Sequence, residues 1–214
     1  MISLLPGLIG LVLNLLVFTR PCLRRQPCSI YFFASTFPNL YIVLVMIPVR
    51  IASGSYNVDP ANLNNIVCKI EIFMLYVMRS LFSWLIVLAC IDRYVISSTG
   101  ETWRRRLSSP KTAIRATIIT TVVIFLIYSH MPVYFNIAAA NQFGQAIPQC
   151  VAQAGTYRTF VNLWLAVIYS VIPVFCMLVF GILTLMSIRQ QRRRVAPMLI
   201  VNLTSQQRKD NQLL

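Results

Sequence analysis

Acidic residues and histidine are scarce in this chain. Its 214 residues include 5 Asp and Glu and 1 His, and only 11% of the residues are charged. Glu71, Asp92 and Asp210 lie far apart, so they form no clustered set for acid–base catalysis. The cysteines and the histidine lack the spacing of a zinc site. The sequence therefore predicts a protein that is not an enzyme and that has no metal site and no cofactor.

Apolar residues make up most of the chain. They account for 57% of it, and the mean hydropathy is +0.71, which is outside the range of soluble globular proteins. Since lipid offers no partner to an open sheet edge, a segment that crosses about 30 Å of hydrocarbon should be helical. The fold class is therefore predicted as an all-α membrane protein with five transmembrane helices, at roughly residues 2–18, 30–49, 70–91, 113–135 and 160–188.

Basic residues are distributed unevenly, and the net charge is +14. Fifteen of the 19 Lys and Arg follow the first apolar run, lie between the third and fourth, or follow the fifth. Arg50, Lys69 and Arg158 lie on the opposite side. By the positive-inside rule the first set is cytoplasmic and the amino terminus is outside. No soluble basic domain exists to bind nucleic acid, whereas these basic loops can hold anionic membrane lipid.

Two cysteines fall on the outer, oxidising side. These are Cys68, at the start of the third run, and Cys150, within a polar, alanine-rich stretch from residue 136 to 156 that we interpret as a loop. They can pair. A bond between them would close about 80 residues and stabilise the fold by roughly 2 to 5 kcal/mol.

Three residues should shape the helices from within. Asn14 is a polar side chain in the first run and needs a partner on a neighbouring helix, unless it lies free near the helix end. Pro38 should kink the second helix, and the amide of Asn39 can satisfy the freed backbone. Pro173 should open the fifth helix in its middle.

The third run carries charge deep in the membrane. Arg79 is too deep to reach the surface comfortably, so it should meet water, an acidic partner or a ligand, or else a helix outside this sequence. At the inner end, Asp92 beside Arg93 should keep the guanidinium paired until the inner face opens, which makes a charged switch. One stripe at helical spacing should face the bundle interior: Tyr76, Arg79, Ser83, Ile86, Cys90 and Arg93.

A cysteine at one membrane face and an Asp92-Arg93-Tyr94 triplet about 37 Å away at the other resembles the third helix of rhodopsin-like G-protein-coupled receptors. Cys150 and Pro173 follow in the order of that family. The resemblance implies an incomplete seven-helix bundle, with a receptor domain over residues 1–205 and the start of a truncated sixth helix over 206–214. It also implies an extracellular ligand, a heterotrimeric G protein that meets the triplet, and a plasma-membrane location for the completed receptor.

The chain departs from the family pattern at informative positions. Asn39 stands about where the family has a sodium-binding aspartate, which puts a sodium site in doubt. Leu75 stands where amine receptors generally have an aspartate, so a peptide or anionic ligand fits better than an amine, as in a neuropeptide-receptor-like subtype. The expected ligand-binding residues are Arg79, Tyr76, Glu71 and Leu75.

Two other functions fit the same sequence. A five-span product could associate with full-length receptors without signalling. A small transporter is the other alternative, but it predicts internal repeats and several polar residues at the membrane midplane. Neither feature is present in the sequence.

Overall fold

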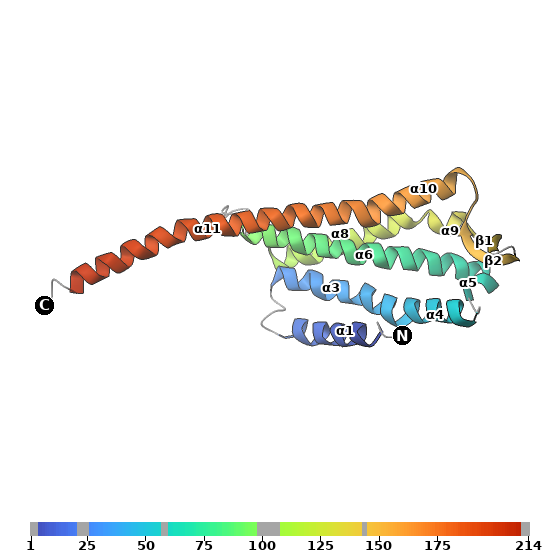
Figure 1. Cartoon of the computed structure of the whole chain (residues 1–214), viewed down its shortest axis with the longest axis horizontal. Helices are drawn as coiled ribbons and strands as arrows, with labels where there is room; N and C mark the ends of the chain where they lie inside the picture. Colours follow the sequence, from blue (N-terminus) through green and yellow to red (C-terminus); the bar gives the residue numbers. More distant parts are fainter. Residues whose placement is uncertain (1–3, 21–25, 57–59, 98–107, 143–144, 211–214) are drawn as a thin grey trace.

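The chain folds into an elongated bundle of helices (Figure 1). The computed structural model describes residues 4–20, 26–56, 60–97, 108–142 and 145–210, the last 19 of these by their backbone only. The helical elements are α1 (Leu4–Phe18), α3 (Pro27–Tyr41), η1 (Ile42–Met46), α4 (Ile47–Tyr56), α5 (Pro60–Leu63), α6 (Asn65–Ser97), α8 (Pro110–Tyr128), α9 (Met131–Tyr134), α10 (Thr156–Leu165), η2 (Ala166–Val171) and α11 (Ile172–Asp210). A hairpin of β1 (Phe135–Gln142) and β2 (Gln145–Ala152) lies at one end, here called the hairpin end. The opposite end, where the Asp92-Arg93-Tyr94 triplet lies, is called the triplet end.

Four helical segments of the described chain are long and apolar enough to cross a membrane. They are Pro27–Ser53, Asn65–Ser97, Pro110–Tyr134 and Thr156–Gln191. The first predicted span is present as a shorter apolar helix, Pro6–Phe18. The chain is thus a multi-pass, predominantly helical membrane protein with a partial bundle, as the sequence predicted.

Helix α6 is the centre of the bundle. It packs against α3, α8 and α11, whereas α1 contacts the bundle through α3 and η1. Its buried side chains pack with those of α3 and α8, and they include Leu81, Leu85 and Ala89 from α6 and Tyr128 from α8. A T-shaped contact of Phe73 with Phe125, with ring centroids 5.8 Å apart, also joins α6 to α8. Of the stripe that we predicted to face the interior, Tyr76 packs against this core, and all six residues are half-buried or exposed.

The start of α8 is set by a side-chain cap and a proline. Ser109 is extended, with φ −116° and ψ 147°, and its side chain accepts a hydrogen bond from the backbone N–H of Thr112 at 3.2 Å. Pro110 follows as the first helical residue, where its missing N–H costs nothing. These two residues place the start of α8 at Pro110, three residues before the predicted span at 113–135.

Two turns of π-helix accompany the intramembrane prolines. The segment η2 ends two residues before Pro173, where we expected the fifth helix to open. The segment η1 likewise ends two residues before Pro48, whereas Pro38 lies inside α3, upstream of η1. A proline removes one helical N–H and its ring crowds the preceding turn, so a locally wider turn relieves that crowding.

The stretch predicted as a loop from residue 136 to 156 is wrong in its local structure, because it contains an antiparallel hairpin. Ile137 lies opposite Cys150 in the register, and Phe135 lies opposite Ala152. Alanine and asparagine have little intrinsic preference for strands. Contacts with helical elements hold the hairpin instead: Asn62 Oδ1 accepts from the Cys150 N–H at 2.9 Å, and the side-chain amide of Asn65 donates to Asn136 Oδ1 at 3.3 Å.

Helix α11 passes well beyond the triplet end of the other helices (Figure 1). Its backbone is continuous to Asp210, so it includes residues 206–210 of the predicted start of a sixth helix. Arg and Gln are the commonest residues between Ile188 and Asp210, and their good helix propensity favours continuation, whereas Pro197 opposes it. Residues 211–214, the rest of the predicted helix start, lie outside the described residues.

Candidate functional site

Arg93 lies near the triplet end of α6 and contacts α3. Its side chain is largely exposed, and its Nε–H donates to Sγ of Cys28 at 3.0 Å. Cys28, the second residue of α3, is 1% exposed. The same sulfur lies 4.0 Å from the carbonyl oxygen of Ala89, one turn before Arg93, and can donate its S–H there. A single thiol therefore joins α3 to two successive turns of α6.

Asp92 points to a different helix. It is 5% exposed, and its Oδ1 accepts a hydrogen bond from Ser108 Oγ at 2.9 Å, just before α8 begins. We expected Asp92 to pair with Arg93, but among the described residues no ion pair joins them. Adjacent residues on a helix point about 100° apart, so the two side chains reach different neighbours. Asp92 Oδ2 is buried and has no hydrogen-bond partner in the described part of the chain.

Tyr94 and Ser97 connect the triplet end of α6 to α11. The ring of Tyr94 lies 6.0 Å from that of Phe180, measured between centroids. The carbonyl oxygen of Ser97 accepts hydrogen bonds from Ser187 Oγ and from Gln191 Nε2, the latter at 2.8 Å. These donors satisfy a carbonyl of the last turn of α6, which has no partner within its own helix.

The hairpin end of α6 is held covalently. Cys68 and Cys150 form a disulfide across a sequence separation of 82 residues, with 5.6 Å between their Cα atoms. The predicted pairing is confirmed. The bond fixes β2 to the first turn of α6, where Cys68 is buried.

The predicted ligand-binding residues do not form one surface. Arg79 is exposed, and its guanidinium has no ion-pair or hydrogen-bond partner among the described residues. Glu71 pairs with Arg50 of α4 at 3.7 Å. Tyr76 is half-buried, and Leu75 is only 5% exposed. Leu75 thus packs inside the protein while Arg79, one turn further along, lies at the surface.

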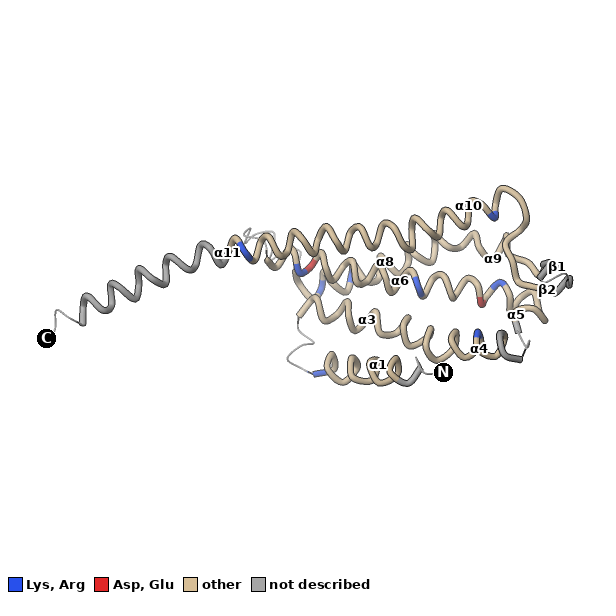
Figure 2. Tube along the Cα trace, viewed as in Figure 1, with Lys and Arg blue, Asp and Glu red and all other residues tan. Residues whose placement is uncertain are grey.

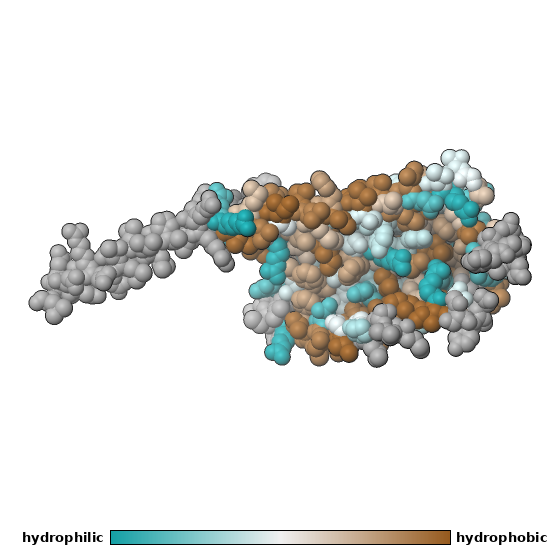
Figure 3. Space-filling view, viewed as in Figure 1, coloured by the Kyte–Doolittle hydropathy of each residue, from teal (hydrophilic) through white to brown (hydrophobic). Residues whose placement is uncertain are grey.

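The surface around the middle of α6 is more polar than its borders. Figure 3 shows hydrophilic surface there, between hydrophobic surfaces over the helices on either side. Figure 2 shows basic residues at both ends of the bundle and within α6. The described basic side chains at the triplet end are Arg20, Arg93, Lys111, Arg115 and Arg189, whereas those at Arg24, Arg25 and Arg104 to Arg106 lie outside the described residues.

Two predicted helix-shaping amides lack the partners that we expected. Asn14 is exposed on α1, and Asn39 is half-buried in α3. Neither side chain makes a hydrogen bond within the described chain. The N–H of Ile42 bonds the carbonyl oxygens of Pro38 and Asn39, so these two carbonyls keep backbone partners within the helix.

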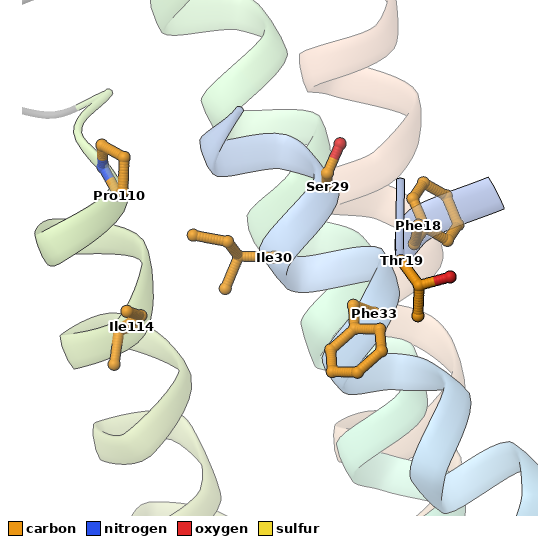
Figure 4. A pocket seen from close by; sticks show the side chains of 7 residues that line it. All are labelled: Phe18, Thr19, Ser29, Ile30, Phe33, Pro110 and Ile114. Carbon is orange, nitrogen blue, oxygen red and sulfur yellow. The ribbon is translucent and has the colours of Figure 1, made fainter. Parts of the chain in front are cut away.

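A pocket of about 420 Å³ opens between α1, α3 and α8 near the triplet end (Figure 4). Phe18, Ile30, Phe33 and Ile114 give it a mostly apolar lining. It contains none of the predicted ligand-binding residues. No group of three or more His, Cys, Asp or Glu residues that could hold a metal ion is found among the described residues.

Sequence reasoning missed the roles of Cys28 and Ser108. From the sequence, Cys28 is only a reduced cysteine beside a loop, and Ser108 is only part of the loop before α8. Ser108 lies 16 residues after Asp92 in the sequence, and Cys28 lies 65 residues before Arg93. A pattern within one helix contains no signal for such contacts.

Comparison with known proteins supports the family assignment. The profile described as 7 transmembrane receptor (rhodopsin family) matches residues 10–212. No curated protein matches the chain. The helical architecture, the disulfide at the hairpin end and the triplet at the other end of α6 agree with that match. The chain belongs to the rhodopsin family of seven-transmembrane receptors.

Proposed function

We propose that the chain forms part of a receptor that takes a ligand at the hairpin end and acts on a heterotrimeric G protein at the triplet end. The observation that carries the proposal is the state of Arg93. Its guanidinium is exposed at the triplet end and is held by a thiol of α3 rather than by the adjacent carboxylate. A cation held by one weak neutral acceptor can move to a new partner at modest cost.

The surroundings of Arg93 suit a protein partner with acceptor groups. Arg20, Lys111, Arg115 and Arg189 are exposed at the same end. A helix that ends in free carbonyls or carries carboxylates is attracted to such a surface, and the attraction raises the rate of encounter. In the proposed orientation the triplet end is cytoplasmic, which the positive-inside rule favours.

At the hairpin end we propose an acidic or carboxylate-bearing peptide as the ligand. Arg79 is an exposed cation within a span, and such a cation favours an anionic partner over water-free lipid. Glu71 is already occupied by Arg50, so it does not offer a simple counter-ion to an amine. The hairpin supplies strand edges to which an extended peptide can add.

Co-purification tests the coupling. The tagged chain in lipid nanodiscs is mixed with purified heterotrimeric G protein after GDP has been removed, and the retained Gα is measured. We expect retention that GTPγS abolishes, and at least about a tenfold loss in Arg93→Gln, since a charge-assisted contact contributes roughly 1.5 to 3 kcal/mol. Arg158→Gln, an exposed arginine of α10 at the opposite, hairpin end, is the matched control. Equal retention by both variants would overturn the proposed role of Arg93.

Peptide binding is tested with the same nanodiscs and pooled synthetic peptides that differ in charge. Acidic peptides should be retained in preference to basic ones, and Arg79→Gln should weaken the retained peptide at least about tenfold. Arg158→Gln, an exposed arginine at the start of α10, provides the control. If Arg79→Gln binds as well as the unaltered chain, Arg79 is not a ligand contact.

Orientation is tested with tags in intact cells. An antibody should reach a tag beside Cys150 without permeabilisation and a tag beside Arg193 only after it. If both tags are reached from the same side, the assignment of the two ends is wrong.

A further inference from the structure

We propose that Cys28 is the positioning residue that holds Arg93 in the resting state, and that Asp92 does not perform this role in this chain. The inference rests on the proposed function, because it names the group that restrains the coupling arginine. The contact is direct, since Arg93 Nε–H donates to Cys28 Sγ at 3.0 Å. Asp92, the expected partner, is engaged by Ser108 instead.

The sulfur is well placed for this role because its own position is fixed. Cys28 is 1% exposed, belongs to the buried core and lies in the first turn of α3. A neutral thiol has one proton to donate and lone pairs that accept. Ala89 O at 4.0 Å can take the proton, which leaves the lone pairs for the guanidinium. The two contacts use the two functions of the thiol without conflict.

Arg93 is held only weakly, because the neighbouring carboxylate of Asp92 bonds a different residue. A carboxylate would hold the guanidinium through a charge-assisted hydrogen bond, whereas a thiol accepts only weakly. The carboxylate of Asp92 instead anchors α6 to the chain before α8. Releasing Arg93 therefore requires breaking its contact with α3 and leaves the contact between Asp92 and Ser108 in place. The triplet end can change state without losing the packing of α6 against α8.

The alternatives to Cys28 around Arg93 are limited. The described basic residues at this end, Arg20, Lys111, Arg115 and Arg189, cannot accept a hydrogen bond from a guanidinium. Among the described residues, Cys28 is the acceptor that the Arg93 side chain reaches. Removing this acceptor while keeping its volume should free the arginine.

The test measures the arginine itself, without a G protein. The full chain is labelled with ¹⁵N-arginine in phosphatidylcholine nanodiscs, and exchange of the Arg93 Nε–H with water is followed by NMR, with Arg93→Lys providing the assignment. We expect this exchange to be at least about fivefold slower than that of Arg115, which corresponds to a hydrogen bond of ~1 kcal/mol. Cys28→Val should abolish the difference, because valine fills a similar space without accepting.

Cys28→Ser provides the rescue, because its hydroxyl accepts and donates as the thiol does; it should keep the slow exchange. Asp92→Asn should also keep it. Fast exchange in the unaltered chain, slow exchange in Cys28→Val, or fast exchange in Asp92→Asn alone would each overturn the proposal. If Cys28→Val does not fold, Cys28→Ala removes the same acceptor and should likewise abolish the slow exchange.

Coupling supplies a second measurement that separates the two proposals. In the co-purification experiment without ligand, Cys28→Val should retain about fivefold more Gα than Cys28→Ser, because less of the population is held at rest. If no variant retains Gα, the proposed function fails while the exchange result still decides the role of Cys28. If Gα is retained equally by Cys28→Val and Cys28→Ser, Cys28 does not restrain coupling.

Discussion

The two ends of α6 are held in different ways. At the hairpin end a disulfide joins Cys68 to Cys150, and side-chain amides of Asn62 and Asn65 add hydrogen bonds to the hairpin. At the triplet end the described contacts are non-covalent: Cys28 with Arg93, Ser108 with Asp92, and two donors of α11 with Ser97. The hairpin end is thus held rigidly. The triplet end can rearrange when contacts that contribute about 1 to 3 kcal/mol each are broken.

This contrast suits a molecule that converts binding at one end into rearrangement at the other. Small shifts at a rigid end are transmitted along a helix, and they are amplified where the opposite end has two packing arrangements of similar free energy. Removing the disulfide should change the stability of the fold most. Removing single hydrogen bonds at either end should change it less.

Removing the disulfide should have the largest effect. In Cys150→Ser the unfolded chain is no longer cross-linked over 82 residues, and the loss of roughly 2 to 5 kcal/mol should lower the thermal midpoint by about 5 to 15 °C. The midpoint is measured by thermal unfolding of the purified chain in nanodiscs. Cys176→Ser, which removes a half-buried free thiol of α11, is the control. Equal midpoints for the two variants would contradict the idea that the hairpin end is the rigid one.

Loosening the contact between α6 and the chain before α8 should have an intermediate effect. Ser108→Ala leaves Oδ1 of the buried Asp92 without its donor, which should cost about 1.5 to 3 kcal/mol. The free energy of unfolding in the same nanodiscs, from denaturant titration, measures it. Ser129→Ala is a suitable control because its hydroxyl is exposed and bonds only Leu126 O, within its own turn. A cost no larger than that of Ser129→Ala would show that Asp92 does not anchor α6.

Weakening the contact between α6 and α11 should have a smaller effect on stability but a visible one on geometry. Gln191→Leu removes a donor to Ser97 O and should cost about 1 kcal/mol. Spin labels on α6 close to Ser97 and on α11 close to position 191 should then report a broader distribution of the distance between them. Gln190→Leu changes the neighbouring exposed side chain and should leave the distribution unchanged. The same broadening in both variants would refute a specific contact.

Removing one hydrogen bond at the covalently held end should have the smallest effect. Asn62→Ala takes away the acceptor of the Cys150 N–H and should cost about 0.5 to 1 kcal/mol. A double-mutant cycle with Cys150→Ser measures the coupling between hydrogen bond and disulfide in free energies of unfolding, with the exposed Asn162→Ala as control. Strict additivity would mean that the disulfide and the amide act independently.

The parts of the fold that depend on local sequence were predictable. Apolar runs indicated the spans, and the side of the membrane indicated the pairing of Cys68 with Cys150. These features depend on composition and on the side of the membrane.

The parts that depend on tertiary contacts were not predictable in the same way. The hairpin formed from residues of low strand propensity because α5 and α6 hold it. Asp92 and Arg93 are neighbours in sequence, which suggested a pair, yet Ser108 and Cys28 are the groups that they contact in space. Leu75 and Arg79 share one face of a helical wheel, but packing buries only Leu75.

The widened turn at Ala166–Val171 has a consequence for any mutational scan of the last span. Each residue added to a turn rotates the remainder of the helix by about 100°. Positions in Thr156–Leu165 and in the span after Pro173 are therefore out of phase with a single 3.6-residue count. If lipid-facing residues are chosen by counting through that turn, the wrong face of the helix is selected. The periodicity should therefore be counted separately before and after the turn.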